Sequence, residues 1–394
     1  MYKHFLVLWF IIISSISFSQ TTVNPDISAI GTFNMFTNNI KGSPEYGKLN
    51  FDIPNMELFV DGYLNPYARA TFNIAYEDGE FSAEEIYAQI VRGLPLDIQV
   101  KAGKYLLGFG KINTVHPHAW LFIYRPLYQQ IYFSPAGFND IGINLSFILP
   151  TGDLYTTLDL GVFKGNAIAN SLLEEGSAIS PSELRGNSPI FVGRIGSFFS
   201  LSDFHNLEVG LSNSFGVYAN SNLNAVGDTA LPQIIDPLYY SYTGIDFKYK
   251  YRPDSYTALV IQGEGLWNYR DVVRQMNMTS SSTVSNEETI STFGYFIYID
   301  YRFDKIFSVG AKYDFTYGIP GDEPSFSTLG NDDQNKTTGI EGWIGYYPIE
   351  ETLALRLGLQ HLMYNFADAT DQDSETTINL QLIFSLGPHK AHPF

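Results

Sequence analysis

The stretch TTINLQLIFSL, from Thr376 to Leu386, carries the pattern that decides the fold of this chain. Apolar and polar residues alternate along it, with Ile378, Leu380, Leu382, Phe384 and Leu386 on one face and Asn379, Gln381 and Ser385 on the other. Successive side chains of a strand point to opposite faces, so the segment is expected to be a strand with one apolar and one largely polar side. A strand of a soluble β-sandwich would show the same pattern, so the fold depends on how often the pattern recurs.

Similar alternation recurs along the whole chain and predicts sixteen strands. They span residues 26–36, 55–64, 68–76, 81–92, 97–110, 138–149, 154–165, 189–201, 207–218, 238–252, 256–268, 292–303, 307–317, 337–347, 352–364 and 376–386. Most reach the 9–11 residues with which a tilted strand crosses a bilayer, and short turns alternate with mostly longer connections, as in bacterial outer-membrane barrels. The pattern therefore predicts an all-β fold, a transmembrane antiparallel β-barrel of about sixteen strands. Pairing of the first strand with the last would leave no unpaired edge in lipid.

Composition supports a membrane barrel. The 394 residues include 27 Tyr, 30 Phe and 34 Gly but no Cys, and the mean hydropathy is only -0.05. A barrel needs an apolar residue only at every second position and carries aromatic girdles at its interfaces, so an overall polar, aromatic-rich chain suits it. The net charge of -18 argues against nucleic acid as a partner, because binding a phosphate backbone needs clustered cations.

The first nineteen residues resemble an export signal. A short basic start with Lys3 and His4 is followed by an apolar run over residues 5–13 and by the small residues Ser17 and Ser19. We expect residues 1–19 to be a signal peptide and 20–394 a single barrel domain, the alternative being an N-terminal membrane anchor. Export and a barrel together predict the Gram-negative outer membrane, with its lipid and lipopolysaccharide as surroundings.

The most informative connection is KINTVHPHAWLFIYRPLYQQIYFSPAG, residues 111–137. It holds Lys111, His116, His118 and Arg125 but no acidic residue, and it is rich in aromatic side chains. Because apolar surface favours burial, we expect this third extracellular loop to fold inward and narrow the lumen, the alternative being an outer loop packed over the rim. Its four cations, together with Lys101 and Arg69 on the inner wall, are the predicted residues of the constriction and solute path.

Several segments also resemble a known family. AGKYLLGFGKINTVHPHAW from Ala102, RPLYQQ from Arg125, NDIGINLSFILPTG from Asn139 and the closing GPHKAHPF from Gly387 are similar to porin-like outer-membrane barrels. That family is related to phosphate-selective porins, and some of its members are labelled zinc-regulated outer-membrane proteins. The resemblance implies a porin-like barrel with the third loop as its constriction. The zinc label concerns regulation and does not indicate a metal site.

Two pairs of histidines are weak candidates for metal ligands. His116 and His118 flank Pro117, and His389 and His392 lie near the C-terminus. Imidazole binds Zn²⁺ readily, but the pairs are expected on opposite sides of the membrane, and neither has a Cys or carboxylate close by in the sequence. We therefore predict no metal site and no cofactor.

Passive transport is the function that the sequence favours. Parity places both basic and acidic side chains in the lumen, so an anion preference rests mainly on the cations of residues 111–137. The prediction is a porin-like channel for small hydrophilic solutes or ions. A homotrimer is suggested only by analogy with other porins. The alternatives are a metal-related binding protein, an adhesin or an assembly scaffold that uses the long loops. A barrel hydrolase is disfavoured, because the Gly210–Ser214 segment lacks the last Gly of a nucleophile elbow; no catalytic residue is predicted.

Overall fold

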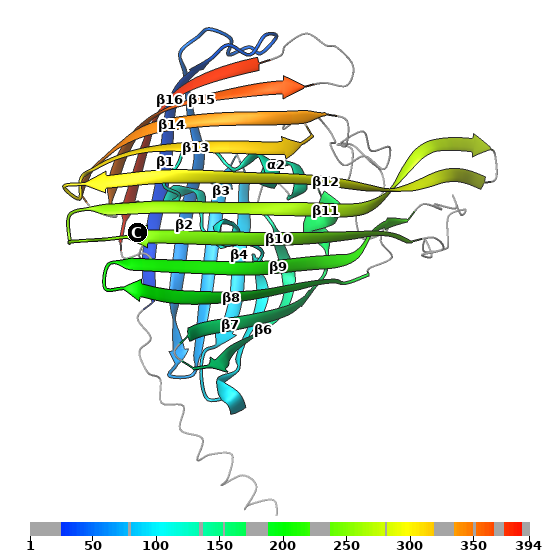
Figure 1. Cartoon of the computed structure of the whole chain (residues 1–394), viewed down its shortest axis with the longest axis horizontal. Coiled ribbons are helices and arrows are strands. Elements are labelled where there is room, and N and C mark those ends of the chain that lie inside the picture. The colour runs from blue at the N-terminus through cyan, green and yellow to red at the C-terminus, as the bar shows by residue number, and fades with distance from the viewer. Residues whose placement is uncertain are drawn as a thin grey trace, which may run out of the picture.

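Sixteen antiparallel strands form one closed barrel (Figure 1). The computed structural model describes residues 25–77, 80–133, 137–152, 154–170, 188–220, 237–279, 282–318, 335–349, 352–365 and 374–387. The strands are β1 (Asp26–Asn38), β2 (Asn50–Asn65), β3 (Ala68–Glu77), β4 (Glu80–Ile90), β5 (Gln99–Leu106), β6 (Asn139–Thr151), β7 (Leu154–Phe163), β8 (Ile190–Ser202), β9 (His205–Asn220), β10 (Pro237–Tyr251), β11 (Ala258–Thr279), β12 (Ser282–Phe303), β13 (Phe307–Tyr317), β14 (Lys336–Ile349), β15 (Leu353–Asn365) and β16 (Ser374–Leu386). Each strand pairs with its neighbours in sequence, and the prediction of sixteen strands is confirmed.

The barrel closes through its first and last strands. β1 pairs with β16 in a register that runs from Ala29 opposite Leu386 to Asn38 opposite Thr377. Because this pairing saturates the backbone groups of both terminal strands, the sheet presents no open edge to the membrane. The alternating stretch 376–386 therefore lies in β16, the strand that closes the barrel against β1.

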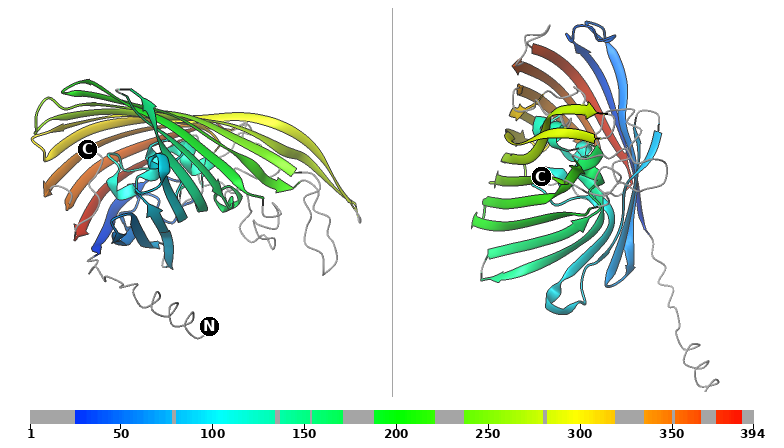
Figure 2. Two further views of the ribbon diagram at one scale, coloured as in Figure 1. Left: turned by 90° about the horizontal axis from the view of Figure 1, so that it is seen from below. Right: turned by 90° about the vertical axis from the view of Figure 1, so that its right-hand side faces the viewer.

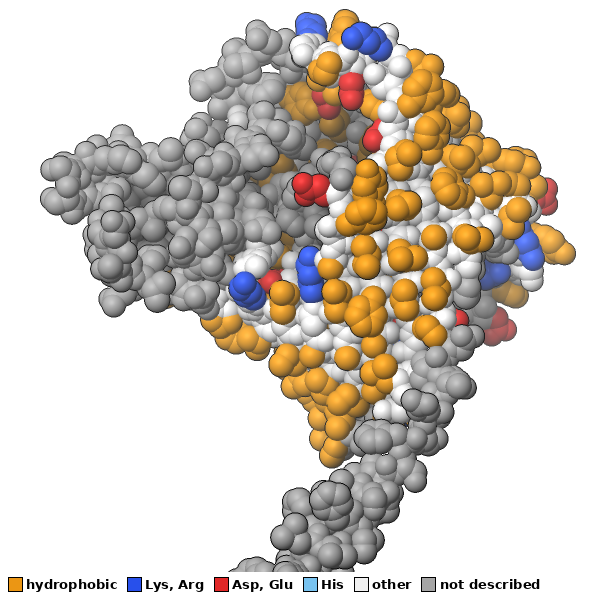
Figure 3. Space-filling model, turned by 180° about the vertical axis from the view of Figure 1, so that it is seen from behind, with side chains coloured by type: hydrophobic (Ala, Val, Ile, Leu, Met, Phe, Trp, Pro, Cys, Tyr) orange, Lys and Arg blue, Asp and Glu red, His pale blue; other side chains and the backbone are white. Residues whose placement is uncertain are grey.

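Side chains alternate between lipid and lumen along each strand. In β15, Leu357 and Leu359 are 45% and 46% exposed on the outer face, whereas Arg356 and Gln360 are buried on the inner one. Figure 3 shows the resulting outer surface, which is covered by apolar side chains while charged ones gather near its borders. An apolar band around a polar interior is the arrangement that a bilayer requires of a barrel.

Several strand predictions differ from the structure in their bounds. The strand expected at 97–110 is only Gln99–Leu106, and the short helix η1 (Pro95–Asp97) precedes it. The ladder with β6 ends at the pair Leu106 and Asn139, so residues 107–110 already belong to the connection that follows. In contrast, β11 and β12 have 22 residues each, because their ladder continues as far as the pair Thr279 and Ser282.

Some predictions lie outside the described residues. They concern the signal peptide at 1–19 and the C-terminal pair His389 and His392. Within the described part of the chain, no helix is long and apolar enough to cross a membrane.

Candidate functional site

The connection between β5 and β6, residues 107–138, runs inside the ring of strands; we call it loop 3. Figure 2 shows it within the barrel, away from the outer surface. It contains two short 3-10 helices, η2 (Ile112–Thr114) and η3 (Pro117–Ala119), and the helix α2 (Leu127–Tyr132). Residues 134–136 are not among those described.

Asn113 ties the two ends of loop 3 together. Its Nδ2 donates to the carbonyl oxygens of Leu107, at 2.8 Å, and of Phe138, at 3.1 Å. Its Oδ1 accepts from the backbone N–H of Phe138 at 2.9 Å. One buried amide thus satisfies three backbone groups at the neck of the loop, so that the chain leaves β5 and enters β6 at a defined point.

Aromatic side chains of loop 3 pack against aromatic side chains of the wall. Phe122 stacks on Trp120 with ring centroids 5.4 Å apart, and its edge contacts Phe296 and Tyr298 of β12. Tyr128 stacks on Phe296 with centroids 6.0 Å apart. These rings belong to one buried cluster that joins the loop to the wall, which accounts for the unusual aromatic content of the connection.

Wall carboxylates hold the loop by accepting from its backbone. Glu264 on β11 accepts from the N–H groups of Lys111 and Ile112, at 3.0 and 2.6 Å, and from the hydroxyl of Tyr128 at 2.9 Å. Its carboxylate is buried. Since a buried carboxylate is costly unless hydrogen-bonded, these donors and the carboxylate stabilise each other.

A second group of wall residues holds the next part of the loop. Glu341 on β14 accepts from the N–H of Ile123 at 2.7 Å, and Asp314 on β13 accepts from the N–H of Leu127 at 3.3 Å. Lys312 lies between these carboxylates, with its Nζ 2.8 Å from Glu341 and 3.3 Å from Asp314, and it also donates to the carbonyl of Tyr124. Loop 3 is thus fastened to β13 and β14 as well as to β11.

The opposite wall contacts loop 3 through its two histidines. His116 Nε2 lies 3.0 Å from Oε2 of Glu85, and its Nδ1 lies 3.3 Å from Glu57 and 3.5 Å from Glu84. His118 Nδ1 lies 3.0 Å from Oε1 of Glu57. We call these five residues the histidine–glutamate cluster; its carboxylates come from β2 and β4.

The pKa of His116 reflects this environment. Burial lowers the pKa of the imidazole, but the charges of Glu57 and Glu84 and the hydrogen bond with Glu85 outweigh burial and raise it well above its ordinary value. The surrounding carboxylates therefore favour a positive charge at this point, where loop 3 meets β2 and β4.

Each of the other predicted path residues is already engaged. Lys111 forms an ion pair with Glu208 of β9, and Arg69 forms one with Asp61 of β2. Lys101 lies over the rings of Tyr87 and Tyr105, 3.7 and 4.0 Å from their centroids. Arg125 lies over the ring of Trp120, 5.1 Å from its centroid.

Carboxylates surround His116 and His118 in space although none lies close to them in the sequence. Glu57, Glu84 and Glu85 all lie within 3.5 Å of their ring nitrogens. Glu85 is 31 residues from His116 in the sequence, and Glu57 is 61 residues from His118. A search for ligands close in the sequence could therefore not find them. The basic character of the loop was a signal for acidic partners on the wall.

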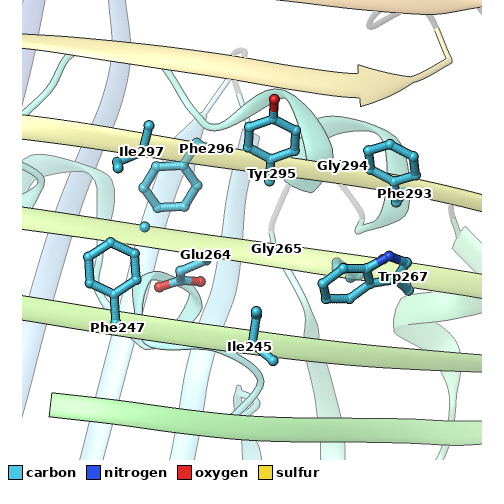
Figure 4. A pocket seen from close by; sticks show the side chains of 12 residues that line it. Ile245, Phe247, Glu264, Gly265, Trp267, Phe293, Gly294, Tyr295, Phe296 and Ile297 are labelled. Atoms are coloured by element: carbon cyan, nitrogen blue, oxygen red, sulfur yellow. The ribbon is translucent and has the colours of Figure 1, made fainter.

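The groove in Figure 4 belongs to the lipid-facing surface. It lies over Gly263 and Gly265, and exposed side chains such as Ile245 and Tyr295 border it. The glycines leave the wall hollow there because they carry no side chain. Its lining is almost entirely apolar, so we do not assign it to a hydrophilic solute.

No family model matches this chain. A protein of Aquifex aeolicus (strain VF5) that carries no functional description is 26% identical over 404 residues, which cover 96% of this chain and 81% of that protein.

Solved outer-membrane proteins share the fold. The anion-selective porin from Comamonas acidovorans covers 92% of this chain and 100% of its own, at 11% identity and a TM-score of 0.56. OprB of Pseudomonas putida covers 92% and 94%, at 9% identity and a TM-score of 0.55. The trimer form of OmpT of Vibrio cholerae covers 92% and 99%, at 8% identity and a TM-score of 0.52.

These likenesses establish the architecture. This chain is a barrel of the Gram-negative outer membrane with the fold of the porins. At such low identity the likeness carries neither the solute nor the selectivity of the other proteins to this one.

Proposed function

We propose that this protein is a passive channel for small hydrophilic solutes or ions, with loop 3 as its constriction. The observation that carries the proposal is the fastening of loop 3 to inward-facing residues around the wall. Its contacts reach Glu57 on β2, Glu264 on β11, Asp314 on β13 and Glu341 on β14. A chain segment fixed across a sixteen-stranded lumen narrows the path without closing off the water-filled space that such a barrel encloses.

Engaged charges argue for a small anion preference at most. Lys111 and Arg69 each face a carboxylate, and His116 and His118 face three. An ion-paired cation contributes little net field to a passing anion, because its partner cancels most of it. The proposed solute path therefore has charges of both signs at close quarters, as expected of a channel with broad selectivity.

We also propose a homotrimer and no enzymatic activity. The OmpT of Vibrio cholerae that shares the fold is described in a trimer form, which supports the first. For the second, Ser212 of β9 accepts from the N–H of Gly110 at 3.0 Å, and Ser214 shares a hydrogen bond with Tyr240 at 2.8 Å. These are roles in packing the loop and wall, and the segment that contains both serines is a plain strand, unlike the strained turn that exposes a nucleophile.

Planar-bilayer recording of the purified, folded protein tests the proposal. A channel is expected to give discrete conductance steps that scale with salt concentration, and its reversal potential in a salt gradient gives the sign of selectivity. A barrel that inserts, shows the heat-dependent gel migration of a folded barrel and conducts nothing would instead support the adhesin or scaffold alternative.

A further inference from the structure

We propose that the histidine–glutamate cluster is a binding site for a divalent transition-metal ion of the Zn²⁺ class, with Nδ1 of His116 and one carboxylate oxygen each from Glu57 and Glu84 as ligands. The three ligand atoms lie within 4.8 Å of one another. The site joins loop 3 to β2 and β4 and does not depend on whether the barrel conducts.

The distances fit a metal better than a hydrogen bond. Nδ1 of His116 lies 3.3 Å from Glu57 Oε2 and 3.5 Å from Glu84 Oε2. Hydrogen bonds between charged groups are about 2.7–2.9 Å long. A tetrahedral Zn²⁺ with bonds of about 2.0–2.2 Å separates its ligand atoms by about 3.3–3.6 Å. Nδ1 is buried and has no partner with hydrogen-bond geometry among the described residues, so it faces the space between the two oxygens with that position open to a metal ion.

The other side of the ring is arranged as metal-binding histidines require. Nε2 of His116 lies 3.0 Å from Oε2 of Glu85, so a neutral imidazole donates its single proton there and leaves Nδ1 free to coordinate. Such a carboxylate partner fixes the tautomer and ring orientation of metal-bound histidines. Asn73 of β3 donates to Glu57 Oε2 and Glu84 Oε2, both at 2.9 Å, and so holds the two ligand oxygens side by side.

A β-bulge brings two consecutive carboxylates to the same ring. Asn73 of β3 pairs with Glu85, and the next residue, Ile74, pairs with Ala83, so that Glu84 is the extra residue in β4. In a regular strand Glu84 and Glu85 would point to opposite faces, and one of them would face lipid. The bulge turns both toward His116; bulges commonly redirect side chains at functional sites.

Burial and charge also favour a cation. Glu57 has a side chain only 1% exposed, and those of Glu84 and His116 are 11% and 12% exposed. Among the described residues, the ion pairs of Glu57 and Glu84 are with histidines alone. Buried carboxylates need positive partners, and the three carboxylates around His116 carry more charge than its one ring can balance, whereas a divalent ion supplies two positive charges. Histidine nitrogen together with carboxylate oxygen is a ligand set that Zn²⁺ accepts, with water completing the coordination.

Zinc titration of the folded, full-length protein in detergent, read by competition with a chromophoric chelator, tests the site. We expect one Zn²⁺ per chain. His116→Ala and Glu84→Gln should abolish binding, and Glu85→Gln should weaken it about 10–100-fold because it removes only the orienting partner. His205→Ala is the matched control: this histidine bonds Tyr249 at 2.6 Å, far along the chain from the cluster, and its loss should change nothing.

Two further measurements keep the test decisive. Heat-dependent gel migration shows whether each variant is folded, and the visible spectrum with Co²⁺ in place of Zn²⁺ reports a tetrahedral site that contains histidine. A double variant, His389→Ala with His392→Ala, should bind Zn²⁺ as the parent does. The proposal is overturned by a parent protein that binds no Zn²⁺, by binding that survives both His116→Ala and Glu84→Gln in folded protein, or by binding that disappears in the double variant alone.

Discussion

Glu264 and Ile112 are 152 residues apart in the sequence, yet the carboxylate of the first accepts the backbone N–H of the second at 2.6 Å. The contact joins the inner face of β11 to the start of loop 3. The same pattern recurs where Glu341 accepts from Ile123 and Asp314 accepts from Leu127. The acidic wall and the acid-free loop are therefore complementary, because wall carboxylates satisfy backbone donors that a loop inside a barrel would otherwise leave unpaired.

Removing the Glu264 carboxylate should loosen the loop. Glu264→Ala leaves the N–H groups of Lys111 and Ile112 and the hydroxyl of Tyr128 without this acceptor. Each buried orphan group costs about 1–3 kcal/mol, so we expect a clear loss of stability in denaturant titrations in detergent micelles. Glu80→Ala is the control, because Glu80 is exposed at the start of β4. This substitution should leave the stability almost unchanged. Equal stability of the two variants would contradict this role of Glu264.

Two glycines near the start of loop 3 should differ sharply in their tolerance of a methyl group. Gly103 has a φ of +140°, and a Cβ there would lie 2.2 Å from the carbonyl oxygen of Ile86. At Gly108 a Cβ would meet nothing within 4 Å. We expect Gly103→Ala to reduce the yield of folded barrel and its unfolding temperature, because the clash is with backbone, and Gly108→Ala to leave both nearly unchanged. Heat-dependent gel migration measures the refolding yield of each variant. Equal yields, or a lower yield for Gly108→Ala, would contradict this expectation.

The stability of the barrel should depend on Lys312 only while Asp314 and Glu341, its carboxylate partners, are present. Lys312→Met leaves Asp314 and Glu341 facing each other without the cation between them, and breaking a buried ion pair costs about 3–5 kcal/mol. Adding Asp314→Asn and Glu341→Gln should recover much of that loss, since the amides keep carbonyl oxygens for the backbone of loop 3. Denaturant titration of the single and triple variants measures the recovery; a triple variant less stable than the single one would refute the argument.

The ion selectivity of the channel should depend on the ion pair between Lys111 and Glu208. Lys111→Gln leaves Glu208 unpaired on β9, so we expect the reversal potential in a KCl gradient to shift toward cation preference. Lys305→Gln is the matched control, because Lys305 lies in a turn over the ring of Tyr256, away from loop 3. An unchanged reversal potential in Lys111→Gln would place the solute path elsewhere.

The wall was predictable because its signal is local. Alternation along segments such as 376–386 depends on neighbouring residues only, and the sixteen strands and their closure follow from it. The end of β5 at Leu106 could not be predicted, since alternation there gives way to Leu107 and Phe109, both buried, and Phe109 packs against Tyr242 of β10. The extension of β11 and β12 was missed because polar residues continue a ladder that the apolar pattern no longer marks.

The site was predictable in part only. The sequence singled out His116 and His118 but not Glu57, Glu84 and Glu85, because the barrel brings them together from three separate segments. The bulge at Glu84 has no marker such as Gly or Pro, so the regular alternation of a strand would have sent one of its two glutamates to the lipid. Tertiary pairing thus decides which charges meet, and the sequence shows only that they are present.

Thiol modification of a single introduced cysteine tests the central claim most directly. The chain has no Cys, so Thr114→Cys, at an exposed position of loop 3, gives one reactive thiol. In bilayer recordings we predict that attaching a charged methanethiosulfonate reagent lowers the conductance step, and that reagents of opposite charge shift the reversal potential in opposite directions. Asp203→Cys, in the exposed turn between β8 and β9, is the control and should show neither effect. Labelled Thr114→Cys protein that conducts as the unlabelled protein does would contradict loop 3 as the constriction.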